Sequence, residues 1–286
     1  MQNIVRSISE DGSAISIAVD STEIVRTMRR YHNTSATASA ALGRLLTAAA
    51  LMGAMLKSDD SSITLRIDAD GPIGKMIAVT DEKSQVRGYC ENPAADAEPK
   101  NKGKLDVAGV VGKNGTLTVI TDLGLKEPYV GQIPLVSGEI AEDITQYYAV
   151  SQQTPTACAL GVLVDKDLSI LSAGGYIVQL LPGTPDSSID IIENNLRILP
   201  PVSEMLRQGM SAEEISLKVL EGLNPNTLDD SSAVYRCTCS RERMRGVLAS
   251  LPKKDREDLA KEGNTEIVCE FCQKRYVFTP EELLEL

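Results

Sequence analysis

The chain of 286 residues is long enough to bury a substantial core, and its 42% hydrophobic and 24% charged residues are ordinary for a soluble protein. A formal net charge of −11 and only 3% aromatic residues argue against a protein whose main partner is nucleic acid. The opening residues, MQNIVRSISEDGS, lack the apolar stretch of a secretory signal, so we expect a cytoplasmic protein whose thiols are kept reduced.

Residues 1–179 carry strand and hairpin signals with helices between them. Alternation of polar and apolar residues around Asp11-Gly12 and Asn114-Gly115 predicts two hairpins, because these dipeptides favour tight turns. A further strand pair is predicted around Asp70-Gly71-Pro72. This pattern indicates an α+β core domain with largely antiparallel sheets packed against helices.

Helices within this domain are predicted at residues 22–32, 36–57 and 141–152. The middle helix contains the most apolar run of the chain, LLTAAALMGAML, which is too short to span a bilayer and rich in small residues. We therefore predict a buried helix there. Two strands are expected after the third helix, with breaks at residues 165–167 and at Gly174-Gly175.

Residues 180–232 are predicted to form a helical linker region. Two segments, 187–199 and 211–223, have apolar residues at helical spacing. Ser211 and Glu214 form a capping-box pattern at the start of the second segment. The stretch NPNTLDDSSA that follows is predicted to be a polar connector.

A small C-terminal module is expected over residues 233–286. Its last segment, TPEELLEL, places Thr279 at a helix cap and Pro280 at the first helical position. Between residues 236 and 256 the chain has seven basic and two acidic residues, a local charge of +5 on a body that is otherwise acidic.

Four of the six cysteines lie in this module as a CxC pair, Cys237 and Cys239, and a CxxC pair, Cys269 and Cys272. Four thiolates are a common ligand set for tetrahedral zinc, although CxC is tighter than the usual spacing and the gap between the pairs is longer than in common zinc ribbons. A core of some fifty residues rarely contributes more than about 3–5 kcal/mol. A structural zinc contributes about 10–16 kcal/mol, so we predict that the module is largely unfolded without it.

Oxidation offers a route by which the zinc would be lost. The Cα atoms of residues two positions apart in an extended strand are about 6.6 Å apart, at the outer edge of the roughly 4.4–6.8 Å that a disulfide tolerates. The CxC pair can therefore form a disulfide with local bending and some strain, and the CxxC pair can form one readily. Both pairs are flanked by basic residues, which favour the reactive thiolate. These are Arg236, Arg241, Arg243, Lys274 and Arg275.

The segments CTCSRERM and CEFCQKRYVF resemble the zinc-binding CxC and CxxC segments of the redox-regulated 33 kDa chaperonin family of bacterial heat-shock holdases. The resemblance covers nearly the whole chain. Further matching segments are TASAALGRLLTAAALMGAMLK, GPIG, KLDVAGVVGKNGTLTVITDLGLKEPYVGQ and GGYIVQLLPG. One departure is Gln152, where the family would have an acidic residue, which puts a local helix contact in doubt.

The resemblance implies an ATP-independent molecular chaperone that acts in the stress response and is not an enzyme. The reduced, zinc-bound form would be an inactive monomer. Oxidation would join Cys237 to Cys239 and Cys269 to Cys272, release one zinc ion and unfold the module with its adjoining linker. The resulting homodimer would hold unfolding client proteins, and neither nucleic acid nor a membrane is an expected partner.

Two other functions fit parts of the sequence. A zinc-ribbon nucleic-acid-binding protein would use the basic segment, and its affinity would fall steeply with salt. A thiol-disulfide oxidoreductase would use Cys269 and Cys272, but it needs a thioredoxin-like context, whereas IVCEFCQKRYVF is typical of a hairpin knuckle.

Other residues carry weaker signals. His32, the one histidine, has no visible catalytic partner and is predicted to be a surface or capping residue. Asp68 and Asp70 are predicted to belong to a turn rather than to a calcium loop. Cys90 and Cys158 are isolated and predicted to pack in the first domain. No GxxxxGK[ST] sequence occurs, which argues against ATP binding by a P-loop.

Overall fold

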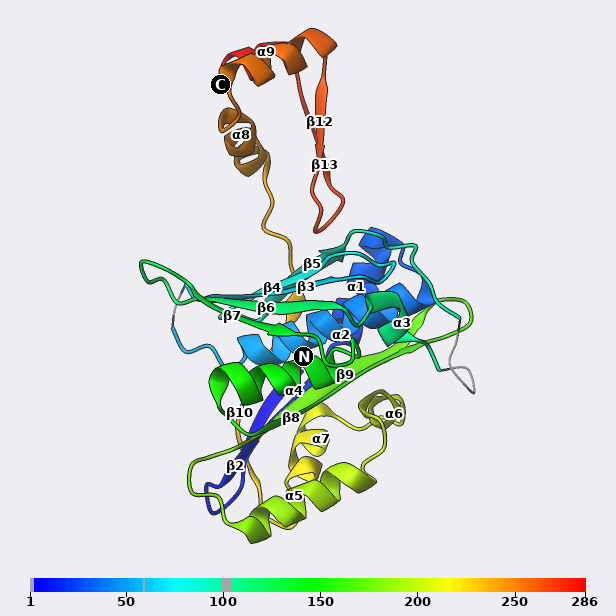
Figure 1. Ribbon diagram of the computed structural model, residues 1–286, viewed down its shortest axis with the longest axis vertical. Helices are drawn as coiled ribbons and strands as arrows, with labels where there is room; N and C mark the ends of the chain where they lie inside the picture. Colours follow the sequence, from blue (N-terminus) through cyan, green and yellow to red (C-terminus); the bar gives the residue numbers. More distant parts are fainter. Residues whose placement is uncertain (1–2, 59, 99–103) are drawn as a thin grey trace. The chain divides into compact units, whose positions relative to one another are not determined.

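The computed structural model describes residues 3–58, 60–98 and 104–286, and it divides into two compact units, Met1–Tyr235 and Arg236–Leu286 (Figure 1). Residues 180–232, expected as a separate linker, belong to the first unit, because their helices and a strand pack on its first sheet. The second unit begins close to residue 233, where the C-terminal module was predicted to start.

The first unit contains a five-stranded antiparallel sheet in the order β10-β1-β2-β9-β8. Its strands are β1 Ile4–Ile8, β2 Ala14–Asp20, β8 Thr156–Val164, β9 Ile170–Leu180 and β10 Asn226–Ser231. The predicted hairpin joins β1 to β2. Gly12 takes a φ of +69°, and the Asp11 carboxylate accepts a hydrogen bond from the backbone N–H of Ser13 at 3.0 Å. This prediction is confirmed.

A second sheet in the same unit has six strands in the order β11-β5-β4-β3-β6-β7. Its strands are β3 Ser62–Ala69, β4 Met76–Asp81, β5 Gln85–Cys90, β6 Gly115–Asp122, β7 Tyr129–Pro134 and β11 Val234–Tyr235. All neighbours are antiparallel except β11, which runs parallel to β5. The strand pair predicted around Asp70-Gly71-Pro72 is the β3–β4 hairpin, so that prediction is also confirmed.

Helix α2, Ala36–Gly53, lies between the two sheets and forms the centre of the larger core (Figure 1). Its length and composition would suffice to cross a membrane, but 89% of its residues are buried inside the structure, as predicted. Small residues allow this close packing. A Cβ on Gly43 would lie 2.9 Å from a methyl carbon of Val25, and one on Gly53 would lie 2.5 Å from the Thr80 hydroxyl.

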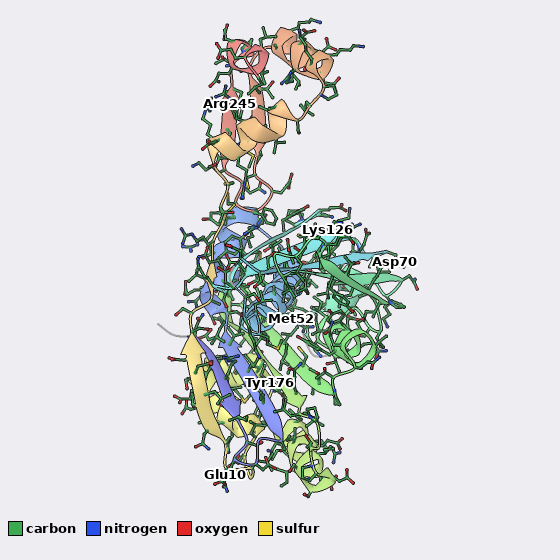
Figure 2. The ribbon with its side chains drawn as sticks, turned by 90° about the vertical axis from the view of Figure 1, so that its left-hand side faces the viewer. Glu10, Met52, Asp70, Lys126, Tyr176 and Arg245 are labelled. Atoms are coloured by element: carbon green, nitrogen blue, oxygen red, sulfur yellow. The ribbon has the colours of Figure 1, made fainter. Side chains whose placement is uncertain are left out.

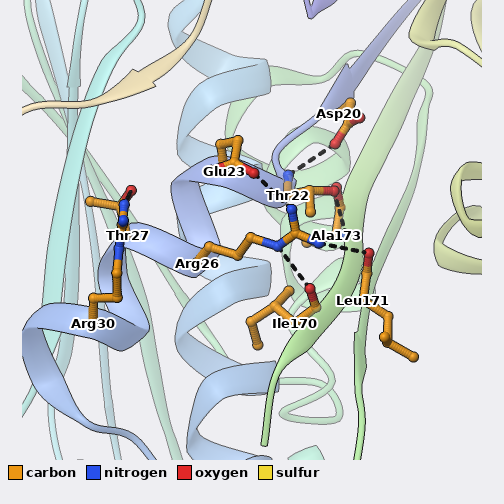
Figure 3. A network of polar contacts seen from close by, with 9 residues as sticks. All are labelled: Asp20, Thr22, Glu23, Arg26, Thr27, Arg30, Ile170, Leu171 and Ala173. Carbon is orange, nitrogen blue, oxygen red and sulfur yellow. Dashed lines mark hydrogen bonds and ion pairs between the residues drawn. The ribbon is translucent and has the colours of Figure 1, made fainter.

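Helix α1, Thr22–His32, is attached to β9 by the polar contacts in Figure 3. The guanidinium of Arg26 donates through Nε to the carbonyl of Ile170 at 2.9 Å and pairs with Glu23 at 2.7 Å. The Thr22 hydroxyl accepts a hydrogen bond from the backbone N–H of Ala173 at 3.0 Å. These bonds fix the start of the helix against the sheet, and its buried face then packs on α2.

Two predictions about strand boundaries in this unit are wrong. The residues before Asn114-Gly115 form helix α3, Val107–Val111, because the Asp106 carboxylate caps it by accepting from the N–H of Gly109 at 2.8 Å. Gly174-Gly175 does not break a strand but lies inside β9, since a Cβ on Gly174 would lie 2.4 Å from the carbonyl oxygen of Val19. Glycine in a strand here permits the close approach of a neighbouring backbone.

Three helices cover the face of the first sheet that is turned away from α2 (Figure 1). They are α5 Asp186–Ile198, α6 Val202–Arg207 and α7 Ala212–Val219. The capping box predicted for α7 is present, with the Ser211 hydroxyl accepting from the N–H of Glu214 at 3.1 Å. Figure 2 places Tyr176 of β9, a member of this second core, and Met52 of α2, a member of the larger one.

The stretch predicted as a polar connector instead contains β10. All six of its side chains are exposed, so the strand carries no apolar pattern in the sequence. It is held by backbone pairing with β1, which has a bulge between Arg6 and Ser7, and by an ion pair of Arg6 with Asp229.

The remaining elements are α4 Ala141–Tyr147 with a π-helical continuation at Tyr148–Gln152 in the first unit, and α8 Arg241–Ala249, α9 Lys253–Glu262, β12 Thr265–Val268, β13 Arg275–Phe278 and α10 Pro280–Leu284 in the second. Thr279 caps α10 and Pro280 is its first residue, as predicted. The amide of Gln152 donates to the Tyr147 hydroxyl at 2.8 Å, which is the helix contact at the position where the sequence departs from the family pattern. The α+β fold class with antiparallel sheets is confirmed.

Candidate metal centre

The two cysteine pairs lie on two segments of the second unit. Cys237 and Cys239 occupy an extended stretch before α8, whose N-cap hydroxyl at Ser240 accepts from the N–H of Arg243 at 3.1 Å. Cys269 and Cys272 lie in the turn between β12 and β13. There the N–H of Cys269 donates to the carbonyl of Lys274 at 2.9 Å, and Gln273 adopts a left-handed φ of +58°. This turn is the hairpin knuckle that the sequence predicted.

The structure brings the four predicted ligands together, with their Sγ atoms all within 4.8 Å of one another. Cys237 Sγ lies 3.6 Å from Cys269 Sγ, and Cys239 Sγ lies 3.4 Å from Cys272 Sγ. A tetrahedral zinc with Zn–S bonds of about 2.3 Å separates its sulfurs by about 3.8 Å, so the observed spacing fits such an ion. No other group of three or more potential ligands occurs within residues 3–58, 60–98 and 104–286.

A small hydrophobic cluster supports the centre. Its buried members are Leu248, Cys269, Tyr276, Phe278 and Leu283. Arg241 of α8 contacts both β13 and α10 at the surface of this cluster. Its guanidinium lies 4.4 Å from the centre of the Phe278 ring and donates to the Glu282 carboxylate at 2.7 Å. Figure 2 labels Arg245 on the same helix, α8.

The cations expected to favour thiolates are engaged elsewhere. Arg243 donates to the Thr238 hydroxyl at 2.8 Å, Arg275 pairs with Glu266 at 2.8 Å, and Lys274 lies 5.2 Å from the centre of the Tyr276 ring. Of these three cations, Arg275 is paired with a carboxylate, whereas Arg243 and Lys274 contact neutral groups.

The four sulfurs differ in their surroundings. Burial opposes ionisation of the Cys239 thiol, but a hydrogen bond from the Tyr276 hydroxyl at 3.1 Å and bonds with neighbouring cysteines outweigh it and lower its pKa to about 7. Burial raises the pKa of Cys272 to about 11 and that of Cys237 well above its ordinary range. A metal bound by these thiolates would therefore displace protons. Tyr276 was not among the residues predicted from the sequence, although strand alternation after the CxxC pair places it on the inner face.

The other singled-out residues lie in the first unit. Cys90 of β5 is buried, and burial raises its pKa to about 12. Cys158 of β8 packs on the larger core, and burial also raises the pKa of its thiol. Both predictions of core packing are confirmed. His32 was predicted to be a surface or capping residue; it is buried in the last turn of α1, so the surface alternative is wrong.

The two acidic residues considered for calcium are bound to protein groups. Asp70, labelled in Figure 2, accepts hydrogen bonds from the backbone N–H groups of Lys113 at 3.1 Å and Asn114 at 3.2 Å, while Asp68 pairs with Arg66 at 2.6 Å. The Asp70 carboxylate thus holds the loop before β6 against the β3–β4 turn, as its predicted place in a turn implies, whereas Asp68 lies inside β3.

Comparison with known proteins shows which family this chain resembles. The profile described as Hsp33 protein matches residues 2–279. The 33 kDa chaperonin of Clostridium botulinum (strain Langeland) is 48% identical over 282 residues, covering 98% of this chain and 95% of that protein. The 33 kDa chaperonin of Geobacillus sp. is 45% identical over 284 residues, covering 99% of this chain and 96% of that protein.

A solved structure agrees with these sequences. The crystal structure of the 33 kDa chaperonin (heat shock protein 33 homolog) from Thermotoga maritima has a TM-score of 0.90 and 39% identity, covering 100% of this chain and 97% of that one. The described fold, the profile match and the identity over almost the full length agree with one another. The chain belongs to the Hsp33 family of 33 kDa chaperonins.

Proposed function

We propose that this chain is a redox-regulated, ATP-independent holdase that is inactive when reduced and zinc-bound and binds unfolding client proteins when its four C-terminal cysteines are oxidised. The observation that carries the proposal is the convergence of the CxC and CxxC sulfurs within 4.8 Å in a unit with a small core. Membership of a chaperone family supports the client class.

In this proposal Cys237, Cys239, Cys269 and Cys272 hold one zinc ion, which supplies folding free energy to the second unit. The five buried residues of its core cluster are few, and a core of this size rarely provides more than about 3–5 kcal/mol. A structural zinc supplies about 10–16 kcal/mol. The fold of the second unit therefore depends on its four thiolates remaining reduced.

Oxidation by a hydroperoxide removes these ligands. Four zinc-bound thiolates, two molecules of hydrogen peroxide and four protons give two disulfides, four molecules of water and a free zinc ion. Each disulfide forms when one sulfur is oxidised to a sulfenic acid and its partner displaces the oxygen as water.

The proposed pairs are Cys237–Cys239 and Cys269–Cys272. Two short sulfur–sulfur approaches in the structure, Cys237 to Cys269 at 3.6 Å and Cys239 to Cys272 at 3.4 Å, each join one cysteine of each motif, so each of these sulfurs would have to turn toward its sequence neighbour as the metal leaves. Cross-linked pairs would tie the two segments together and preserve the fold, whereas neighbour pairs release it. Peptide mapping by mass spectrometry after peroxide treatment distinguishes the two patterns.

A segment that we call the latch, residues 226–235, would transmit this change to the first unit. It adds β10 to one sheet and β11 to the other. The side-chain amide of Asn3 accepts a hydrogen bond from the N–H of Ala233 at 2.8 Å and donates one to the Ala233 carbonyl at 3.1 Å. The Tyr235 hydroxyl donates to the carbonyl of Gly88 at 3.0 Å. Tyr235 precedes Cys237 by two residues, so the part of the chain that would unfold follows the latch directly in the sequence.

Release of the latch and of the linker helices before it would expose an apolar surface. The helices bury one face on the first sheet through residues that include Ile192, Val202, Met205, Ile215 and Val219. An apolar surface of this kind binds the exposed hydrophobic segments of unfolding proteins. The active form is proposed to be a cytoplasmic homodimer, with no catalytic residue and with neither nucleic acid nor a membrane as partner.

Light scattering of a thermally unfolding client protein tests the proposal. Peroxide-treated protein should suppress aggregation, and reduced, zinc-loaded protein should not. A Cys90→Ser, Cys158→Ser variant is the matched control and should switch like the unmodified chain, because neither residue belongs to the cluster. Equal suppression by reduced and oxidised protein would contradict the switch.

A further inference from the structure

Tyr276 reaches the sulfur cluster because of its place on β13. Side chains alternate along the strand, so Tyr276 and Phe278 face inward while Arg275 and Val277 face solvent. Phe278 fills the core cluster, and Tyr276, which is 5% exposed, belongs to the same buried cluster as Cys269. The strand thus places a phenol hydroxyl among the sulfurs.

The hydroxyl of Tyr276 donates a hydrogen bond to Cys239 Sγ at 3.1 Å. Two other sulfurs have backbone donors: the amide of Cys239 bonds to Cys237, and the amide of Lys274 bonds to Cys272. Backbone donors come with the knuckle geometry and survive side-chain replacement. The bond to Cys239 is different, because a residue 37 positions away along the chain supplies it through its side chain.

We propose that Tyr276 is a positioning residue of the redox switch, whose hydroxyl holds the Cys239 sulfur in the ligating arrangement and slows its oxidation. This inference depends on the proposed zinc-bound function. The new element is a residue other than cysteine that sets the zinc affinity of the CxC pair and its rate of zinc release.

The chemistry follows from the electron pairs of the sulfur. To be oxidised by hydrogen peroxide, the Cys239 thiolate must use a lone pair to attack one oxygen, breaking the O–O bond and giving a sulfenic acid and hydroxide. Cys237 then attacks that sulfur and displaces a second hydroxide to form the disulfide. A hydrogen bond from Tyr276 draws on the same lone-pair density, and it also keeps Cys239 aligned with Cys272, 3.4 Å away, instead of turning toward Cys237.

Tyr276→Phe removes the hydroxyl and keeps the ring in the core cluster and under Lys274. Loss of such an outer partner of a metal ligand typically weakens metal binding about 10- to 100-fold. We expect weaker zinc binding of that order, measured by competition with a chromophoric chelator in the full-length reduced protein. Zinc release under peroxide should be faster, and peptide mapping at early times should find more Cys237–Cys239 disulfide than in the unmodified chain.

Two further measurements keep the test decisive. Tyr129→Phe, which alters an exposed tyrosine of the first unit, should leave both zinc affinity and release rate unchanged. In the unmodified chain loaded with cadmium-113, the Tyr276 hydroxyl proton should be protected from solvent exchange and coupled to the metal through Cys239. That measurement needs no variant, so it applies even where Tyr276→Phe does not fold.

The inference fails if Tyr276→Phe matches the unmodified chain in zinc affinity and release rate, or if the Tyr276 hydroxyl proton exchanges as freely as that of Tyr129. The failure of the proposed function is a separate result. It would appear in the unmodified chain as an absence of zinc binding or as client protection that does not depend on oxidation.

Discussion

Replacing Tyr235 with phenylalanine should loosen the latch without altering the sulfur cluster. The Tyr235 hydroxyl donates to the carbonyl of Gly88 at 3.0 Å and accepts from its N–H at 3.4 Å, while its ring lies 5.5 Å from that of Tyr31. Tyr235→Phe removes the two hydrogen bonds and keeps the ring contact. At a net value near 1 kcal/mol for the better bond and less for the longer one, the loss is about 1–2 kcal/mol.

A loss of this size raises the open population of the latch about 5- to 30-fold. Hydrogen exchange of the reduced, zinc-loaded protein measures it directly, because amides of β10 and β11 exchange through local opening. We expect protection in Asn226–Tyr235 to fall by that factor while protection in α2 is unchanged. The peroxide dose needed for client protection should fall as well, because the latch of the variant opens at a lower free-energy cost.

Two outcomes would refute this reasoning. Unchanged protection of β10 and β11 would show that the Tyr235 hydroxyl does not hold the latch. An equal loss of protection in α2 would show that the first unit opens as a whole, so that no separate latch exists. Tyr129→Phe is the matched control, because its hydroxyl contacts the carbonyl of Ser151 and lies outside the latch.

Three further predictions concern stability. Chelation of zinc from the reduced protein should remove exchange protection from β12 and β13 and leave α2 protected; protection that persists in both strands would contradict a metal-dependent fold. Phe278→Ala should cost about 3–5 kcal/mol, seen as zinc affinity lowered about 10²-fold or more in chelator competition, whereas the exposed Val277→Ala should change it little. The Arg6 hydrogen bond lowers the pKa of Asp229, so the pair stabilises β10 above the unfolded carboxyl pKa of about 3.9 and loses this effect as pH falls through the lower folded value. Asp229→Asn should abolish that acid dependence of β10 exchange, and an unaltered dependence would assign it to other carboxylates.

The elements that the sequence predicted best have strong local signals. The Asp11-Gly12 turn, the capping boxes at Ser211 and Thr279, and the small-residue helix α2 each depend on residues that are adjacent or one turn apart. The close spacing within each cysteine pair is a local signal of the same kind, whereas the approach of the CxC pair to the CxxC pair joins residues 32 and 33 positions apart.

The elements that the sequence did not predict depend on distant partners. β10 has six exposed side chains and forms only because the edge of β1, more than 200 residues earlier, is available for pairing. Gly174-Gly175 has the composition of a strand break, but β9 continues through it because the backbone of β2 pairs there and lies too close for a side chain. Tyr276 could have been found from the alternation of β13, whereas its bond to Cys239 required the three-dimensional arrangement.

The most direct test of the central claim is a peroxide titration in which zinc release, disulfide content and suppression of client aggregation are measured on the same samples. All three should rise together, reaching one zinc ion and two disulfides per chain when client protection is complete. Client protection by fully reduced, zinc-loaded protein, or zinc release and two disulfides without any protection, would contradict it.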